Sequence, residues 1–151
     1  MFATQPVFFA GIASFEAEVD AASGDLLDSS STIELHGTLD VLYTNGFTPT
    51  GFWARTIIEG SNITGEFDVV NVPPAGVGFV TRVINTGTEL IVGQTCPSDT
   101  NLDGALDFFD VSKFLSDFAA MNPAADLNGD GAFNFFDVSV FLANYSGGCS
   151  L

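Results

Sequence analysis

The feature that most constrains this chain is an internal duplication in its last third. Residues 99–115 and 126–142 align without a gap at a constant offset of 27 residues. In both copies an Asp/Asn-rich stretch is followed by an apolar one. A match of this kind indicates one supersecondary unit used twice, so the repeat has to be interpreted before local propensities are considered.

Each copy reads as a loop of twelve positions with Gly104 or Gly131 at position six. Oxygen-bearing side chains stand at positions one, three, five, nine and twelve, the spacing by which an EF-hand-type loop surrounds a hard cation. The glycine permits the sharp turn that such a loop needs. These positions are Asp99, Asn101, Asp103, Asp107 and Asp110, then Asp126, Asn128, Asp130, Asn134 and Asp137.

Position twelve distinguishes these loops from many others of the type, because it is Asp110 or Asp137 where Glu is common. Asp is one methylene shorter, so the loop has to close more tightly. Magnesium demands a smaller and stricter octahedral site, which makes two Ca²⁺ ions the expected cofactor. The alternative reading, two solvated Asp-rich turns, accounts poorly for two copies in register.

A helix is expected after each loop. Apolar residues recur at i, i+3, i+4 and i+7 in both copies, which is typical of a helix with one buried face. Asp110 and Asp137 fall at the helix starts, where a negative charge suits the helix dipole. Residues 96–98 and 121–125 are too short to form a helix before either loop, which argues against a calcium sensor that opens a groove. The apolar stripes are Val111, Phe114, Leu115 and Phe118, then Val138, Phe141, Leu142 and Tyr145.

With these features, residues 96–151 resemble a dockerin domain, in which two calcium loops without entering helices are each followed by one helix. The resemblance implies that the ten loop residues named above are calcium ligands. It also implies a cohesin-like partner on a scaffold or cell-surface protein. The pattern around the aromatic pairs is more similar to dockerin-type tails at the C-termini of large secreted bacterial proteins.

Positions ten and eleven depart from the dockerin pattern. Dockerins often carry small or polar partner-reading residues there, whereas this chain has Phe108, Phe109, Phe135 and Phe136. One interpretation is a paired hydrophobic contact patch for a partner. The other is that at least one Phe of each pair belongs to the core.

The composition changes near residue 95, and residues 1–95 read as an all-β domain without helical periodicity. The turn-rich segments 37–41, 45–50 and 60–68 resemble the last coils of bacterial β-solenoid surface proteins. The expected fold class is therefore mixed: a β-solenoid end or β-sandwich-like part over 1–95, then a small α dockerin-like domain over 96–151. The strands expected are Ser14–Val19, Thr32–Leu35, Thr38–Tyr43, Phe52–Glu59, Asn62–Phe67, Val77–Asn85 and Glu89–Val92.

The two cysteines, Cys96 and Cys149, bracket the duplicated segment. A disulfide between them would close a loop of roughly 50 residues and stabilise the fold by roughly 4 kcal/mol in the chain-entropy model. Such a bond implies an oxidising, extracytoplasmic setting. The alternative is two free, partly buried thiols.

Charge narrows the possible functions. With 19 acidic and 3 basic residues, the formal charge is −16. Nucleic-acid binding is disfavoured because it needs basic patches. No stretch approaches the roughly 18 apolar residues of a membrane span. Residues 1–10 lack the basic start of a signal peptide, so the chain is expected to be the C-terminal part of a longer, secreted or cell-surface product.

Catalytic signatures are weak. His36 is the only histidine and has no second histidine to share a metal. Glu16, Glu18, Asp20, Glu34, Glu59 and Glu66 fit solvated strand positions better than a carboxylate pair for sugar chemistry. We therefore expect a non-enzymatic docking or anchoring module. The alternatives are a calcium-stabilised cap without a partner, and the C-terminal fragment of a polysaccharide-active enzyme.

Overall fold

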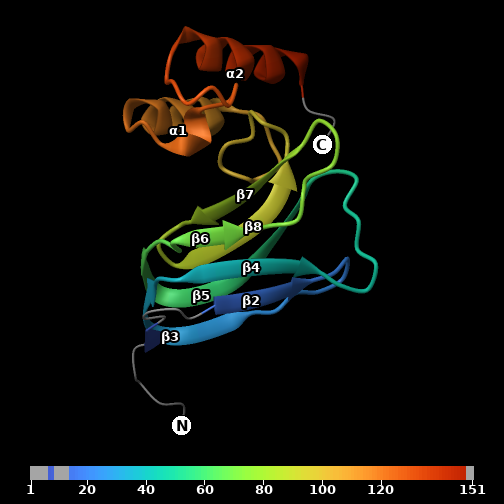
Figure 1. Ribbon diagram of the computed structural model, residues 1–151, viewed down its shortest axis with the longest axis vertical. Helices are drawn as coiled ribbons and strands as arrows, with labels where there is room; N and C mark the ends of the chain where they lie inside the picture. The colour runs from blue at the N-terminus through green and yellow to red at the C-terminus, as the bar shows by residue number, and fades with distance from the viewer. Residues whose placement is uncertain (1–6, 9–13, 149–151) are drawn as a thin grey trace.

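The computed structural model describes residues 7–8 and 14–148. Two β-sheets lie face to face, and a helical part lies beyond one end of them (Figure 1). The larger sheet has the strand order β1-β3-β5-β8-β7, and the smaller one has the order β2-β4-β6. The strands are β1 (Val7–Phe8), β2 (Ser14–Val19), β3 (Leu27–Leu35), β4 (Thr38–Tyr43), β5 (Trp53–Gly65), β6 (Val69–Asn71), β7 (Val80–Asn85) and β8 (Glu89–Thr95).

The chain alternates between the two sheets as it advances. Strands β1, β3 and β5 are parallel neighbours in the larger sheet, and β2, β4 and β6 are parallel neighbours in the smaller sheet. Each successive pair of strands (β1 and β2, β3 and β4, β5 and β6) therefore adds one parallel strand to each sheet. Strands β8 and β7 then continue the larger sheet in antiparallel fashion. A sandwich-like β part over residues 1–95 is compatible with this topology.

Alternating side chains from both sheets build one shared core. In β2, Ala17 and Val19 are completely buried while Glu16 and Glu18 are exposed. This is the period-two pattern of a strand with one solvated face. The glutamates therefore take the outward positions expected from the sequence. Ala17 and Val19 belong to one buried cluster with seven residues of the larger sheet: Ile33, Leu35, Ile57, Ile58, Ile63, Leu90 and Val92.

Strand boundaries were predicted with uneven success. The predictions of Ser14–Val19 and Thr38–Tyr43 are confirmed. The prediction of two separate strands, Phe52–Glu59 and Asn62–Phe67, with a turn between them is wrong, because the single strand β5 runs from Trp53 to Gly65. Gly60 lies in this strand so close to Ile33 that an added Cβ would come within 3.0 Å of the Ile33 Cδ1 atom. That glycine therefore allows close packing between strands rather than a turn.

The helical part comprises α1 (Phe108–Ala119), the short 3₁₀ helix η1 (Pro123–Ala125) and α2 (Phe135–Gly147). The rings of Phe114 and Phe141 stack between α1 and α2 with centroids 4.3 Å apart. Leu115 and Leu142 are more than half exposed, so the predicted apolar stripes are only partly buried.

The predicted fold class is wrong. In the described residues the chain is mostly β, with only two α-helices in its C-terminal part, and the expected two-loop α dockerin-like domain is not seen. The physical reason is the small size of the helical core, whose fully buried members are Phe114, Ala125 and Phe141. So small a core gives little stability by itself. Strand β8 leads directly into Ser98 and Asp99, which are buried.

Candidate metal centre

The first loop, residues 99–110, closes on the carboxylate of Asp99, which is completely buried. Its Oδ1 atom accepts hydrogen bonds from the backbone N–H groups of Leu102 at 2.7 Å and Asp103 at 3.3 Å. Its Oδ2 atom accepts one from Gly104 at 3.0 Å. Gly104 has a φ of +81°, a conformation that strongly favours glycine, which is why the loop turns there.

The second loop, residues 126–137, repeats this geometry. Asp126 Oδ1 accepts from the backbone N–H groups of Gly129 at 2.9 Å and Asp130 at 3.2 Å. Asp126 Oδ2 accepts from Gly131 at 2.9 Å. In both copies the carboxylate at position one therefore accepts hydrogen bonds from the backbone N–H groups of positions four, five and six, as the duplication predicts.

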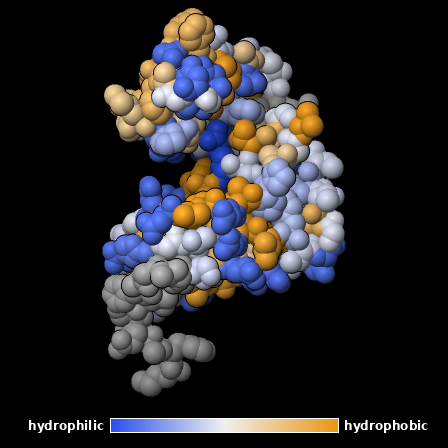
Figure 2. Space-filling view, viewed as in Figure 1, coloured by the Kyte–Doolittle hydropathy of each residue, from blue (hydrophilic) through white to orange (hydrophobic). Residues whose placement is uncertain are grey.

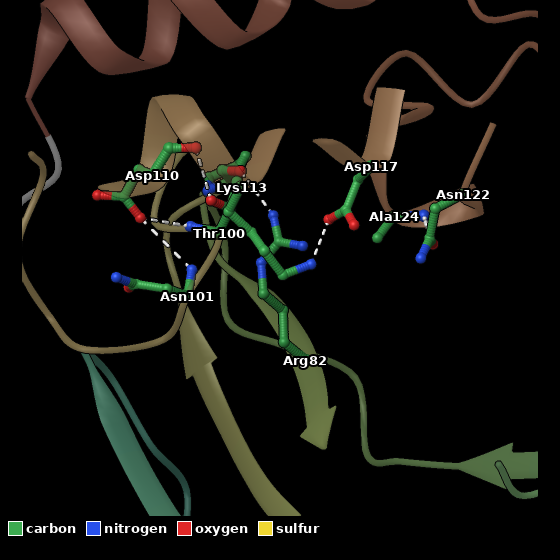
Figure 3. Close-up of polar contacts among 9 residues, drawn as sticks. Arg82, Thr100, Asn101, Asp110, Lys113, Asp117, Asn122 and Ala124 are labelled. Carbon is green, nitrogen blue, oxygen red and sulfur yellow. Dashed lines mark hydrogen bonds and ion pairs between the residues drawn. The ribbon is translucent and has the colours of Figure 1, made fainter. Parts of the chain in front are cut away.

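Asp110 joins the two ends of the first loop. Its Oδ1 atom accepts from the backbone N–H groups of Thr100 at 2.8 Å and Asn101 at 3.4 Å (Figure 3). Its Oδ2 atom accepts from Asp107 at 2.9 Å. Asp137 makes the corresponding bonds to Leu127 and Asn134 at 3.0 and 2.9 Å. Both carboxylates are completely buried.

Position nine has a role in the structure that the sequence analysis did not assign. Asp107 and Asn134 are helix N-caps, whose side chains accept from the N–H groups of Phe109 at 2.7 Å and Phe136 at 2.8 Å. With Asp110 and Asp137 they form capping boxes at the starts of α1 and α2. The three-residue spacing of the paired polar residues is a sequence signal that would have revealed this.

Positions three and five lie side by side at the exposed end of each loop. Asn101 Nδ2 donates to Asp103 Oδ2, and Asn128 Nδ2 donates to Asp130 Oδ2, both at 2.8 Å. In residues 7–8 and 14–148, no three His, Cys, Asp or Glu side chains gather in the manner of a metal site. The carboxylates instead accept bonds from backbone amides, so calcium coordination by these residues stays a prediction.

The donor chemistry of the first loop nevertheless fits a hard cation. Its side-chain acceptors are carboxylate and amide oxygens, the ligands that Ca²⁺ prefers. Burial raises the pKa of Asp110, and the nearby negative charge of Asp99 adds to that effect. Two buried carboxylates that repel each other are costly unless a cation compensates them.

The second loop lies in a different electrostatic setting. Here the backbone N–H of Asn134 is the main cause that lowers the pKa of Asp137. Burial opposes this effect but does not outweigh it. The two copies are therefore similar in hydrogen bonding and different in surroundings.

Two hydrogen bonds join the first loop and the residues before it to the β part. Thr95 Oγ1, at the end of β8, donates to Asp99 Oδ2 at 2.5 Å. Arg82 Nη2, from β7, donates to the carbonyl oxygen of Pro97 at 2.7 Å. Sequence reasoning missed Arg82 and Thr95, because neither belongs to the repeat and no local pattern marks a contact made through tertiary folding.

The four phenylalanines at positions ten and eleven are exposed. Phe108, Phe109, Phe135 and Phe136 retain 73, 66, 74 and 65% of their accessible surface. The interpretation that one Phe of each pair belongs to the core is therefore wrong. Each pair occupies the first two residues of a helix, at positions ten and eleven of its loop, so the loop and the helix overlap there. Their role in partner binding stays a prediction.

The remaining sequence predictions have different outcomes. Cys96 is buried, but Cys149 lies outside the described residues, so the disulfide stays a prediction. His36 Nε2 lies 3.2 Å from Glu34 Oε1 on the exposed surface. In the part of the chain that the structure describes, no helix is both long and apolar enough to cross a membrane.

The chain matches no protein-family model, no curated protein and no solved structure.

Proposed function

We propose that the two loops bind calcium and that the helices they precede form a non-enzymatic docking site for a partner protein. The observation that carries the proposal is the position of the exposed Phe pairs. Phe108 and Phe109 begin α1, Phe135 and Phe136 begin α2, and the capping boxes that start these helices are part of the loops. A loop that is held in shape therefore holds an aromatic pair in place.

Calcium would supply the positive charge that the loop carboxylates lack. The residues that would hold it are the ten loop positions with oxygen-bearing side chains: Asp99, Asn101, Asp103, Asp107 and Asp110, then Asp126, Asn128, Asp130, Asn134 and Asp137. Only the folded loops bring these residues together, so calcium binding would stabilise the folded chain by mass action.

The exposed aromatic pairs supply the contact surface. Large aromatic side chains provide much of the binding energy in protein interfaces, and these four retain about two thirds or more of their accessible surface. The resemblance of residues 96–151 to dockerins makes a cohesin-like module the first partner to test. We place this function outside the cytoplasm, on a secreted or cell-surface protein.

The calcium proposal is tested by thermal unfolding of the full chain with Ca²⁺, with Mg²⁺ and with chelator. We expect calcium to raise Tm and magnesium to raise it less. The loop variants are Asp110→Asn and Asp137→Asn, which keep the side-chain shape but replace one accepting oxygen by an amide donor. This exchange lowers Tm even in chelator, so the quantity compared with the parent chain is the gain in Tm on adding calcium, which we expect to be smaller. Identical transitions in calcium and chelator would refute calcium binding.

The docking proposal is tested by titrating the chain with a recombinant cohesin-like module. We expect calcium-dependent binding that Phe108→Ser with Phe109→Ser, or the equivalent pair in α2, weakens without lowering Tm. These positions are exposed, so the substitutions should leave the fold intact. Calcium-dependent stability together with unchanged binding would refute the role of the Phe pairs.

A second candidate function is a structural one, in which calcium only rigidifies the end of the β part. The attachment of the first loop to the sheet through Arg82 and Thr95 favours it. The two candidates differ in the titration above, because a purely structural element binds no cohesin-like module with or without calcium.

A further inference from the structure

Arg82 lies between the larger sheet and the first loop. It belongs to β7, the outermost strand of that sheet. It lines a cleft of about 450 Å³ between the β part and the helical part, which is the hollow below the helices in Figure 2. Its guanidinium extends from the strand toward Thr100 and Lys113 (Figure 3). Its Nη2 atom donates to the carbonyl oxygen of Pro97, two residues before Asp99. A positive charge from the β part therefore reaches the first loop.

This guanidinium acts on the loop through space rather than through a direct ion pair. Among the described residues, no ion pair includes Arg82. Its Nε atom is buried and has no hydrogen-bond partner in that part of the chain. Burial lowers the pKa of the guanidinium, whereas the carboxylates of Asp99, Asp117 and Asp110 raise it. Asp117 already has Lys113 as its cation, which leaves Asp99 and Asp110, at loop positions one and twelve, for Arg82.

The two loops differ in charge at one of their five ligand positions. Position nine is Asp107 in the first loop and Asn134 in the second, so the first carries four carboxylates and the second three. The charge of Arg82 brings the first loop to the net charge of the second. Arg82 also shares a smaller cleft of about 390 Å³ with Asp126. The carboxylates that raise the pKa of its guanidinium nevertheless belong to the first loop or to α1.

We propose that Arg82 is a fixed counter-charge of the first loop, which offsets the repulsion between Asp99 and Asp110 without calcium and lowers the affinity of that loop for calcium. This role rests on the calcium binding proposed above. Two buried carboxylates are costly without a cation, and a guanidinium keeps its proton. A Ca²⁺ ion held by the same carboxylates places two positive charges near a third, and like charges repel.

The two aromatic pairs then differ in their need for calcium. Phe108 and Phe109 begin a helix whose loop has a cation of its own, whereas Phe135 and Phe136 follow a loop that has none from Arg82. In chelator, hydrogen exchange should therefore be slower in residues 99–110 than in residues 126–137. Arg82→Gln should remove part of this difference.

Calcium titration calorimetry of the full chain tests the effect on affinity, one loop at a time. Asp103→Asn and Asp130→Asn change the same position of the two loops, and both side chains are exposed. Each substitution weakens one loop and leaves the other to be measured. With Asp130→Asn present, we expect Arg82→Gln to tighten the Kd of the first loop about fivefold, the effect of removing one partly screened like charge. With Asp103→Asn present, Arg82→Gln should leave the Kd of the second loop unchanged.

Two further variants separate local charge from other effects. Arg55→Gln removes the same charge from β5, where the guanidinium donates to the Ala21 and Ala54 carbonyls, and should change neither Kd. Arg82→Lys keeps the charge and should keep the Kd of the parent chain. Equal tightening by Arg82→Gln and Arg55→Gln, or equal tightening of both loops by Arg82→Gln, would overturn the proposal.

A measurement with Arg82 intact covers the case in which Arg82→Gln fails to fold. The NMR signal of the Arg82 Nε–H group should move when calcium fills the first loop of the Asp130→Asn variant. It should stay in place when calcium fills the second loop of the Asp103→Asn variant. If the parent chain binds no calcium, the proposed function fails and the role of Arg82 fails with it. If calcium binds but neither the first-loop Kd nor the Arg82 signal responds, only the role of Arg82 is refuted.

Discussion

Among single residues, Gly93 shows most directly how tightly the β part and the first loop pack together. A Cβ atom there would lie 2.3 Å from the carbonyl oxygen of Trp53 and 3.0 Å from Leu102 Cδ2. We expect Gly93→Ala to destabilise the chain by at least roughly 1–3 kcal/mol, the usual cost of forcing atoms into a packed interior. Chemical denaturation measures this cost. The matched control is Gly51→Ala, which meets no atom within 4 Å and should be near neutral.

Asp20 gives a pH prediction that does not involve the loops. Hydrogen bonds from Asn45 first, and then from the backbone of Ser23 and Ala22, lower its pKa from 3.8 to about 2. A lowered pKa means that the charged form stabilises the fold. This contribution is complete above pH 3.8 and is lost as the pH falls through 3.8 toward 2.

The direct measurement is an NMR titration of the Asp20 carboxyl carbon, which should report a pKa near 2. The Tm difference between the parent chain and Asp20→Asn should also shrink between pH 6 and pH 2.5. An Asp20 pKa near 3.8, or a Tm difference that grows on acidification, would contradict this account.

Single residues of the loops were predictable because the repeat fixes their positions twice. The carboxylates of Asp99 and Asp126 accept hydrogen bonds from backbone N–H groups of their own loops. These partners lie only three to five residues away in the sequence, so the loop spacing is enough to predict them. The partnership of Arg82 with Pro97 was not predictable. It joins positions 15 residues apart across two elements, and only the finished fold brings them together.

Each helix in this chain depends on a polar cap. In chelator, Asp107→Ala and Asn134→Ala should each cost about 1 kcal/mol, the typical effect of losing an N-cap side chain. Unfolding in denaturant measures the loss, and Ser112→Ala, an exposed helical position, is the control. If position nine also takes part in calcium binding, the cost will be larger in calcium than in chelator. Equal costs in the two conditions would restrict these residues to capping.

The two helices were easier to predict than the limits of the strands. The presence of each helix follows from the apolar periodicity, which is local, although the helices begin at Phe108 and Phe135, before the Asp110 and Asp137 that the sequence analysis placed at their starts. The continuity of β5 depends instead on Ile33 of the neighbouring strand, against which Gly60 packs. A glycine that allows close approach and a glycine that allows a turn look the same in the sequence.

For the whole molecule, the β-rich character of residues 1–95 was visible in the composition, but the separate α domain was not a valid expectation. The repeat predicts two similar units and says nothing about what each one contacts. In the structure the first unit is buried against the sheet and the second lies farther out (Figure 1). Among the described residues the helical core has three buried members, so we expect the helical part to rely on the β part for its stability.

Arg82 is the residue through which this reliance can be measured. Burial lowers the pKa of its guanidinium, while the carboxylates of Asp99, Asp117 and Asp110 raise it, so it faces both the sheet and the acidic loop. Arg82→Met keeps the apolar stem and leaves the Pro97 carbonyl without its donor, at a cost of about 1–3 kcal/mol. We expect hydrogen exchange to accelerate in α1 and α2 while the amides of Ile33 and Val92 stay protected.

The matched control for this experiment is Arg55→Met, which removes the same group from β5, on the other side of β8, where it donates to the Ala21 and Ala54 carbonyls, and should leave exchange in the helices unchanged. If Arg82→Met instead accelerates exchange uniformly in sheets and helices, the chain unfolds as one unit and Arg82 contributes only to its total stability. If it accelerates exchange in the helices alone, Arg82 sets the stability of the helical part relative to the sheets. The exposed Phe pairs would then be held in place by the sheet as well as by their own loops.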